Sequence, residues 1–385
     1  MKAIEFLENN ERKIVKFLQE LVSIPSQNGI NAEKDIAWVV VKKLKEFGLK
    51  PKLVDNKERP SILCVLGKSS GKKLLLNAHL DTVSSGDPKK WKHRPFSGKI
   101  MGNKLSGRGS ADAKAAVAIF CYLAGALAKT QTRLGGQLIL GFDSDEESGN
   151  FTGFKHLIKE IGRVDAALIG YPGINEIIIG SRGFLRLEIT TFGKAAHTGS
   201  QSQKGVNAIL KMNRIMTALS NLQLTHKKDH FFRFGPKLTI SQISGGWAIN
   251  IVPDECSINI DIRLVPGQTK EQVIEQIKKT LKFEQDYKID IFQYQPAFKT
   301  DPKERLVKIL KRNAEKVLKR KIRLTASGAG GVGNLLGGIR VPTISGFGVE
   351  FGNAHGANEW LNIKTILPVA KIYLKTVVEF LATCI

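Results

Sequence analysis

The sequence predicts an α/β protein with a mostly parallel sheet that carries helices on both faces, plus an inserted α+β domain of ferredoxin-like order. Three observations predict this fold. Apolar strand patterns alternate with helical patterns over residues 1–180. The order changes to βαββαβ over residues 181–295. The alternation resumes over residues 296–385, so the first and last segments form one domain around an inserted one.

Each element of the larger domain is predicted from its periodicity. Apolar residues recur at helical spacing over 3–21 and 32–47, whereas 61–66 and 73–78 are apolar runs of strand length. The other expected elements are a buried helix at 112–129, a strand at 137–142, a helix at 151–161, a strand at 166–170, a helix at 303–318, a strand at 322–326, a helix at 332–336, a strand at 343–346 and a helix at 365–381.

The inserted domain is predicted from alternating strands with helices between them. Residues 183–192 alternate apolar and polar side chains, which is typical of a half-buried strand. The remaining elements are a helix at 206–219, strands at 237–244 and 256–264 joined through Gly245 and Gly246, a helix at 269–281 and a strand at 288–294. This order places both helices on one face of an antiparallel sheet.

The net charge of +24, from 59 Lys and Arg against 35 Asp and Glu, first suggests nucleic-acid binding. The lysines are spread along predicted helix faces, however, and the densest run, from Lys308 to Arg323, has no interleaved aromatic residues to stack on bases. We therefore expect a generally basic protein or a field that attracts an anionic substrate, and no nucleic-acid partner.

The sequence also limits where the protein works. No apolar run suggests a membrane span or a signal peptide, because charges or glycines interrupt each one. The four cysteines lack CxxC spacing and are expected to be buried, unpaired residues in a reducing cytoplasm: Cys64, Cys121, Cys256 and Cys384.

Metal-ligand residue types follow two of the predicted strands. His79 and Asp81 lie two residues apart, so a strand places both side chains on the same side, where the carboxylate could orient a ligating imidazole. Asp145, Glu146 and Glu147 follow the strand at 137–142. Three carboxylates there are costly unless a cation neutralises them or the turn is solvated.

Two further segments add to this set. Asp112 follows a glycine-rich loop at a predicted helix start, where it serves either as a ligand or as an N-cap. His355 lies in a late glycine-rich loop, where a lone histidine is ordinarily just a polar loop residue. The four segments together read, in chain order, HxD, GRGxxDxK, DEExG and GxxHGxxE.

This motif order resembles the zinc-dependent family of acetylornithine deacetylase, succinyl-diaminopimelate desuccinylase, aminoacylase and carboxypeptidase G. The resemblance covers nearly the whole chain, and smaller matches such as 193–197, 205–208 and 250–253 support it. It implies a catalytic domain of residues 1–180 and 296–385, and a dimerisation or lid domain of residues 181–295.

The resemblance also implies a role for each motif residue. In the catalytic domain, His79 binds a first zinc and Asp81 orients that histidine. Asp112 bridges both metals and is followed by a cis peptide to Ala113. Glu147 and His355 bind the second zinc, and Glu146 is the general base.

Roles are implied outside the metal ligands as well. His197 serves the partner subunit's site by stabilising the oxyanion, unless it is only a surface histidine. Four residues are expected to bind the substrate: Arg182, Asn250, Arg263 and Gly330. Arginine suits an anionic group because its fork binds a carboxylate through two bonds, although Arg182 and Arg263 could instead be ordinary strand-face arginines.

The chain departs from the family pattern at two positions. Tyr171 stands where the family has a zinc-binding glutamate, and Val332 stands where an aspartate is usual. A tyrosine is a poor zinc ligand unless the metal strongly lowers its pKa. Either Tyr171 contacts the metal or its water, or the first site is weak, or the chain is a catalytically impaired, binding-only member.

The combined prediction is a cytoplasmic, homodimeric hydrolase that cuts an amide bond in a small N-acyl amino acid or short peptide. We expect one tightly bound Zn²⁺ and a second, weaker one, with Co²⁺ or Mn²⁺ able to substitute. All six expected residues are present together: His79, Asp81, Asp112, Glu146, Glu147 and His355.

Overall fold

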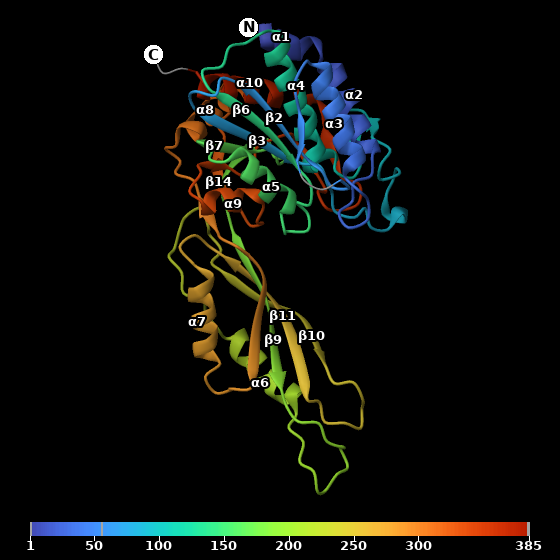
Figure 1. The fold of residues 1–385 in the computed structure, drawn as a ribbon, viewed down its shortest axis with the longest axis vertical. Helices are drawn as coiled ribbons and strands as arrows, with labels where there is room; N and C mark the ends of the chain where they lie inside the picture. Colours follow the sequence, from blue (N-terminus) through green and yellow to red (C-terminus); the bar gives the residue numbers. More distant parts are fainter. Residues whose placement is uncertain (1, 55–56, 383–385) are drawn as a thin grey trace. The chain divides into compact units, whose positions relative to one another are not determined.

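The computed structural model describes residues 2–54 and 57–382. It divides the chain into two compact units, one built from Met1–Gly180, Thr300–Thr325 and Gly331–Ile385, and the other from Ser181–Lys299 and Ala326–Gly330 (Figure 1).

The larger unit is built on a mixed, mostly parallel six-stranded sheet. Its order is β1-β2-β6-β3-β7-β15. The pairs β6–β3, β3–β7 and β7–β15 are parallel, whereas β1–β2 and β2–β6 are antiparallel. The strands are β1 (Lys52–Val54), β2 (Ser61–Gly67), β3 (Lys73–His79), β6 (Gln137–Asp143), β7 (Ala166–Ile169) and β15 (Thr343–Ile344). The predicted fold class is therefore confirmed, with an antiparallel edge.

Helices cover both faces of this sheet. Leu157 of α5 contacts the position of Gly141 from one face, whereas Phe120 of α4 lies against Gly170 on the other. Helix α10 packs against α4 and α8 (Figure 1). The helices are α1 (Lys2–Asn9), α2 (Glu11–Ser23), α3 (Lys34–Glu46), α4 (Ala115–Lys129), α5 (Thr152–Ile161), α8 (Arg305–Leu318), α9 (Val332–Gly338) and α10 (Ile366–Phe380).

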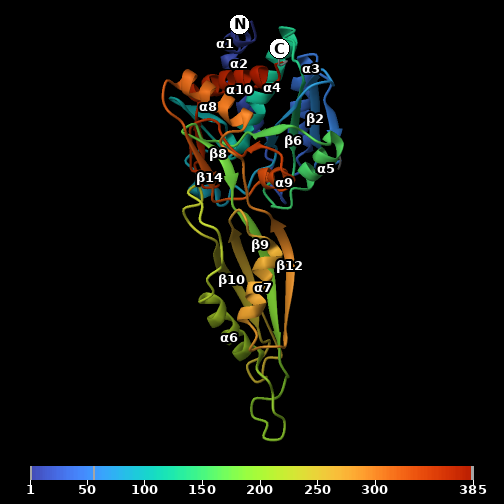
Figure 2. The ribbon, with the colours of Figure 1, turned by 90° about the vertical axis from the view of Figure 1, so that its left-hand side faces the viewer.

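The smaller unit has the predicted βαββαβ order (Figure 2). Its sheet, β10-β11-β9-β12, is antiparallel throughout. One apolar core joins Met212 and Ile215 of α6 with Val273 and Ile277 of α7 and the strand residues beneath them, so both helices cover the same face. The elements are β9 (Gly183–Phe192), α6 (Ala208–Ser220), β10 (Lys237–Gly245), β11 (Glu255–Leu264), α7 (Lys270–Thr280) and β12 (Tyr287–Gln295).

Two short sheets complete the fold. Their orders are β13-β8-β14 and β16-β17-β5-β4. Their strands are β4 (Lys99–Met101), β5 (Lys104–Ser106), β8 (Glu176–Ser181), β13 (Phe298–Lys299), β14 (Arg323–Ser327), β16 (Phe351–Gly352) and β17 (Trp360–Asn362).

Two helix predictions need correction. The expected helix at 3–21 is split into α1 and α2, because the Asn10 side chain donates a 2.8 Å hydrogen bond to the Phe6 carbonyl and caps the first helix. The expected helix at 112–129 begins with an irregular turn, Ser110–Lys114, in which the peptide bond from Asp112 to Ala113 is cis.

The helical run Ser110–Lys129 corrects the expectation that no segment resembles a membrane span. By length and composition it could cross a membrane, but 89% of its apolar window is buried inside the protein, as in the core helix of a globular domain. Cys64, Cys121 and Cys256 are free and buried as expected, whereas Cys384 lies outside the described residues.

Candidate metal centre

The candidate site lies at the carboxyl ends of neighbouring parallel strands. Strand β3 ends at His79, which pairs in register with Asp143 at the end of β6. Ligands commonly bind at this edge of an α/β sheet. The chain leaving β3 carries Asp81, and the chain leaving β6 carries Glu146 and Glu147.

Asp112 lies between two histidines. Its Oδ1 is 3.1 Å from Nε2 of His79, and its Oδ2 is 3.2 Å from Nε2 of His355. His355 Nε2 is also 3.4 Å from Oε1 of Glu147. Two groups have ligand atoms within 4.8 Å of one another and could each hold a metal ion: His79 with Glu146 and Glu147, and Asp112 with Glu147 and His355.

The electrostatics of this cluster favour a cation. Burial lowers the pKa of His79, but its hydrogen bond with Asp112 and the nearby carboxylates of Asp81 and Glu146 outweigh burial and raise that pKa well above its usual value. Hydrogen bonds with Asp112 and Glu147 raise the pKa of His355 to about 10. Burial raises the pKa of Glu146 well above its usual value. Carboxylates packed this closely need protons or a divalent cation to neutralise them.

Asp81 connects the two strand ends. Its Oδ1 accepts a 3.1 Å hydrogen bond from the Glu146 amide, and its Oδ2 accepts a 2.9 Å bond from the Glu147 amide. The His79 ring is held by the Asp81 main-chain oxygen, 2.9 Å from Nδ1, whereas the nearest carboxylate oxygen is 3.6 Å away. The Asp81 side chain therefore fixes the carboxylate loop, and its backbone orients the imidazole.

Sequence reasoning missed an ion pair that supports the Asp112 turn. The Glu359 carboxylate accepts hydrogen bonds from the Gly109, Ala111 and Asp112 amides at 3.1, 3.0 and 3.3 Å. Arg108 Nη1 donates to it at 2.6 Å, and both side chains are almost completely buried.

This pair also joins the two loops that carry Asp112 and His355. Arg108 Nη2 donates 3.1 Å hydrogen bonds to the carbonyls of His355 and Gly356. Arg108 lies in the GRGxxDxK motif and Glu359 in the GxxHGxxE motif. Their opposite charges next to metal-ligand residues were the sequence signal for this ion pair.

Tyr171 lies in the site, but its hydroxyl is bound to a carboxylate. Its hydroxyl donates a hydrogen bond to Oε1 of Glu146, and its ring lies 5.7 Å from the His79 ring. The absence of a side chain at Gly331 makes room for the phenol, because a Cβ there would lie 2.8 Å from its oxygen. Val332 is buried at the start of α9.

In the smaller unit, two predicted residues lie side by side on exposed loops. His197 and Ile251 form an isolated β-bridge, and the Thr198 amide donates a 3.0 Å hydrogen bond to the Asn250 carbonyl. Nδ1 of His197 accepts a 3.0 Å bond from the Gly199 amide. The side chains of His197 and Asn250 are exposed.

Three more predicted residues surround Phe184. Arg263 lies over the Phe184 ring at 5.9 Å, and a Cβ at Gly330 would lie 3.0 Å from the same ring and 3.3 Å from the Arg182 carbonyl. Arg182 donates to the Phe234 carbonyl. Arg263 Nε donates to Asp261 at 2.7 Å.

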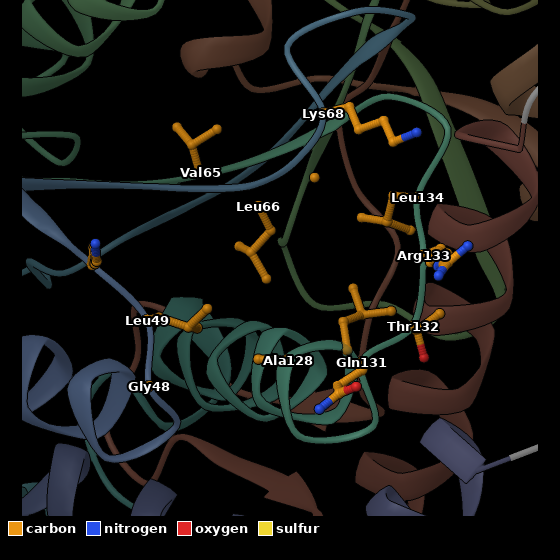
Figure 3. A pocket seen from close by; sticks show the side chains of 13 residues that line it. Gly48, Leu49, Val65, Leu66, Lys68, Ala128, Gln131, Thr132, Arg133 and Leu134 are labelled. Carbon is orange, nitrogen blue, oxygen red and sulfur yellow. The ribbon is translucent and has the colours of Figure 1, made fainter.

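A groove of about 480 Å³ lies at the other end of the main sheet (Figure 3). It is lined by Val65 and Leu66 near the end of β2, which pairs with the start of β6, and by residues such as Leu134. Lys68 and Arg133 also line it, but none of its lining residues is a histidine or a carboxylate. The groove therefore offers no metal ligands and is separate from the candidate centre.

A family model described as peptidase family M20/M25/M40 matches residues 75–379, a range that contains every residue of the candidate centre. The chain belongs to peptidase family M20/M25/M40. The family suggested by the four motifs is thereby confirmed. This M20 chain is an enzyme, a metallohydrolase that acts on amide or peptide bonds, in a family that depends on a dinuclear metal centre.

Relatives and solved structures agree with this assignment. An uncharacterized metallohydrolase of Methanocaldococcus jannaschii is 28% identical over 406 aligned positions, covering 93% of this M20 chain and 97% of the relative. A succinyl-diaminopimelate desuccinylase of Rickettsia bellii is 25% identical over 357 positions, covering 88% and 90%. The aminopeptidase PepT from Bacillus cereus has the same fold, with a TM-score of 0.78, 22% identity and coverage of 97% and 99%.

Proposed function

We propose that this M20 enzyme hydrolyses the amide bond of a small N-acyl amino acid or short peptide, as a deacetylase, desuccinylase or peptidase. The single observation that carries the proposal is Asp112 between His79 and His355, with Glu146 and Glu147 beside them. The desuccinylase relative supports an N-acyl amino acid, whereas the PepT neighbour has only its fold in common with this chain.

The donor set fits Zn²⁺, which prefers histidine nitrogen and carboxylate oxygen, with Co²⁺ or Mn²⁺ as substitutes. Asp112, Glu147 and His355 supply three ligands for one ion. With Glu146 assigned as the base and Glu147 assigned to the first ion, His79 and the shared Asp112 supply two for a second ion. When bound, the metal acts as a Lewis acid that polarises the substrate carbonyl and activates water.

Glu146 is proposed as the general base that accepts a proton from the attacking water and returns it to the leaving nitrogen. Three observations support this role: its carboxyl is buried, it lies next to the metal ligands, and Asp81 fixes its backbone. The hydrogen bond from Tyr171 holds one Glu146 oxygen, Oε1. Oε2 then remains to take the proton.

We infer that the two metal sites are unequal. Tyr171 donates its hydroxyl to Glu146, so in this arrangement it does not provide the charged oxygen that the family's glutamate provides. Burial raises the pKa of Tyr171 well above its usual value, which opposes the phenolate form. The ion beside His79 is therefore expected to dissociate more easily than the ion bound by Glu147 and His355.

The anionic end of the substrate is assigned to Arg182, Asn250, Arg263 and Gly330. The cluster of Arg182, Arg263 and Gly330 around Phe184 supports this assignment. Asp261 partly neutralises Arg263, and both arginines are proposed to face the anionic group of the substrate. The net charge of +24 would also attract an anionic substrate.

We further propose a cytoplasmic homodimer assembled through the smaller unit, with His197 acting in the partner subunit's site. Apolar residues on the smaller unit support an interface there, since Ile243 is 56% exposed and Trp247 is 74% exposed. Trp247 lies with the exposed Ile249 along one surface hollow, and contiguous exposed apolar side chains commonly mark protein contacts. Strand β10 lies at the sheet edge, where a second strand can pair.

A substrate panel tests the proposal. Chelator-treated enzyme is supplied with Zn²⁺, Co²⁺ or Mn²⁺ and assayed on N-acetyl and N-succinyl amino acids and on di- and tripeptides. Metal-dependent release of a free amine supports the proposal. Tight metal binding without turnover of any amide would instead favour the binding-only alternative. That alternative is suggested by Tyr171, which stands where the family has a zinc-binding glutamate.

A further inference from the structure

The segment from Ser26 to Asn31 runs alongside the chain that leaves β3, and Gln27 forms an isolated parallel β-bridge with Thr82. The Thr82 amide donates to the Ser26 carbonyl at 2.9 Å, and the Asn28 amide donates to the Thr82 carbonyl at 2.8 Å. The Ser26 hydroxyl donates to the Leu80 carbonyl at 2.8 Å. These three bonds flank Asp81 on both sides and fix Asn28 next to it.

Asn28 uses its side-chain amide to join two carboxylates. Its Nδ2 donates to Oδ2 of Asp81 at 2.9 Å and to Oδ1 of Asp145 at 3.1 Å. An Asn amide nitrogen carries two hydrogens, so both are used. The Asp81 carboxylate in turn accepts the amide hydrogens of Glu146 and Glu147. One side chain therefore connects the chain after β3 to the acidic loop after β6.

Arg59 provides a second contact to Asp145. Its Nη1 is 3.6 Å from Oδ1 of Asp145, and its Nε is 3.5 Å from Oε2 of Glu33. Glu33 is completely buried, and neither of its side-chain oxygens has a hydrogen-bond partner among the described residues. A buried carboxylate on one side and Asp145 on the other hold the guanidinium in place.

This arrangement separates three consecutive acidic residues by function. Asp145 has a positive φ of 65° and turns to Asn28 and Arg59, whereas Glu146 and Glu147 face the metal-ligand histidines. Without a donor between them, the Asp81 and Asp145 carboxylates would repel each other, and the loop would lose the contact that sets its direction.

We propose that Asn28 is a positioning residue of the metal centre, which holds Glu147 and Glu146 in place by bridging Asp81 and Asp145. The inference rests on the proposed metal centre and adds a residue outside every motif used to recognise it. Asn28 touches no predicted metal ligand directly, so its effect passes through the Asp81 carboxylate and the loop amides.

The test compares Asn28→Ala and Asn28→Asp with wild type, by titrating Zn²⁺ and Co²⁺ into chelator-treated protein in a calorimeter. Loss of a supporting hydrogen bond around a metal ligand typically weakens affinity by about 10- to 100-fold. We expect a loss of this size for Asn28→Ala. Asn28→Asp keeps the shape of the side chain but replaces the donor with a third carboxylate, so its metal affinity should fall at least as much. In both variants kcat should change by a larger factor than KM.

Asn31→Ala is the matched control, because Asn31 lies in the same segment and its side-chain oxygen accepts hydrogen bonds from the backbone and side-chain amides of Gln27. It should keep wild-type metal affinity, even if its Tm falls. Metal affinity of folded Asn28→Ala or Asn28→Asp within about twofold of wild type would overturn the proposal. If the wild type binds metal tightly but cuts no amide, only the proposed function is contradicted. The role of Asn28 is still decided by the metal affinities of its variants. A wild type that binds no metal would overturn both.

Discussion

Asp112 divides its carboxylate between two histidines, with Oδ1 facing His79 and Oδ2 facing His355. Glu359 holds the turn that carries Asp112, because its carboxylate accepts hydrogen bonds from three backbone amides of the turn and from Arg108. The Asp112 carboxylate can therefore contact two metal ions without moving. Tyr171, in contrast, directs its hydroxyl to Glu146, so an ion beside His79 would have no ligand from this residue in this arrangement.

We predict that dialysed wild-type enzyme retains one metal per chain and that Tyr171→Glu retains two. A glutamate supplies the carboxylate that the first site lacks, and tight zinc sites need about three protein ligands. Elemental analysis after dialysis measures both values. Tyr171→Phe is the control, because it removes the hydroxyl without adding a ligand and should still retain one metal. Two equivalents retained by wild type would show that another group completes the first site.

At the residue scale, sequence motifs located the metal-ligand residue types but not the contacts between them. His79, Asp112, Glu147 and His355 were expected to meet, and their ligand atoms do lie together. The contacts of Glu359 and Asn28 were not predicted: Glu359 offered only its charge inside a motif as a signal, and Asn28 lies outside every motif. Spacing also could not show that Tyr171 bonds to Glu146, since that contact depends on loop direction.

At the element scale, the fold is strongly determined where apolar periodicity is long. Strands β3 and β6 and helix α4 were expected close to their observed positions because burial on all sides leaves continuous apolar runs. The boundary between α1 and α2 was missed because Asn10 ends a helix within an uninterrupted periodic pattern. The residue before helix α3, Glu33, is an acid whose side chain is fully buried.

Burial raises the pKa of Glu33 to about 7, against the opposing effect of Arg59 and with smaller contributions from Asp81 and Asp145. Because the folded-state pKa exceeds the unfolded one, the stability that Glu33 contributes is present below about pH 4.5 and is lost as the pH rises through 7. Glu33→Gln cannot ionise. We therefore predict that its stability relative to wild type rises between pH 5 and pH 8, by at most on the order of 3 kcal/mol.

Urea unfolding of both proteins at the two pH values measures this difference. Glu58→Gln is a suitable control, because Glu58 is largely exposed and pairs with Lys34 on the surface. It should show no such pH dependence. A Glu33→Gln variant whose relative stability is the same at pH 5 and pH 8 would contradict the assigned cost of burying this carboxylate.

At the scale of the whole molecule, the larger unit contains all the candidate metal ligands, and the smaller unit contains His197 and the arginines assigned to the substrate. The βαββαβ order of the smaller unit was predictable because each strand and helix there has a clear period. The exposure of Trp247 was not predictable, since an exposed tryptophan looks like a core residue in a sequence.

We predict a homodimer in which His197 acts in the partner subunit's site. Mixing His197→Ala chains with Glu146→Gln chains should then restore activity, because mixed dimers contain one site with both wild-type groups. Activity of the mixture after subunit exchange measures this, and light scattering gives the mass. A fully active monomer, or a mixture no more active than its parents, would rule out the shared site.

We propose that this M20 enzyme cuts amides with a bound metal and with Glu146 as the base. The most direct test is to compare turnover and metal content of wild type and Glu146→Gln on a substrate that the panel identifies. We predict that Glu146→Gln keeps the wild-type metal content but loses turnover by a factor on the order of 10² to 10⁴, as expected for removal of a general base. Near-normal turnover with intact metal would contradict the claim.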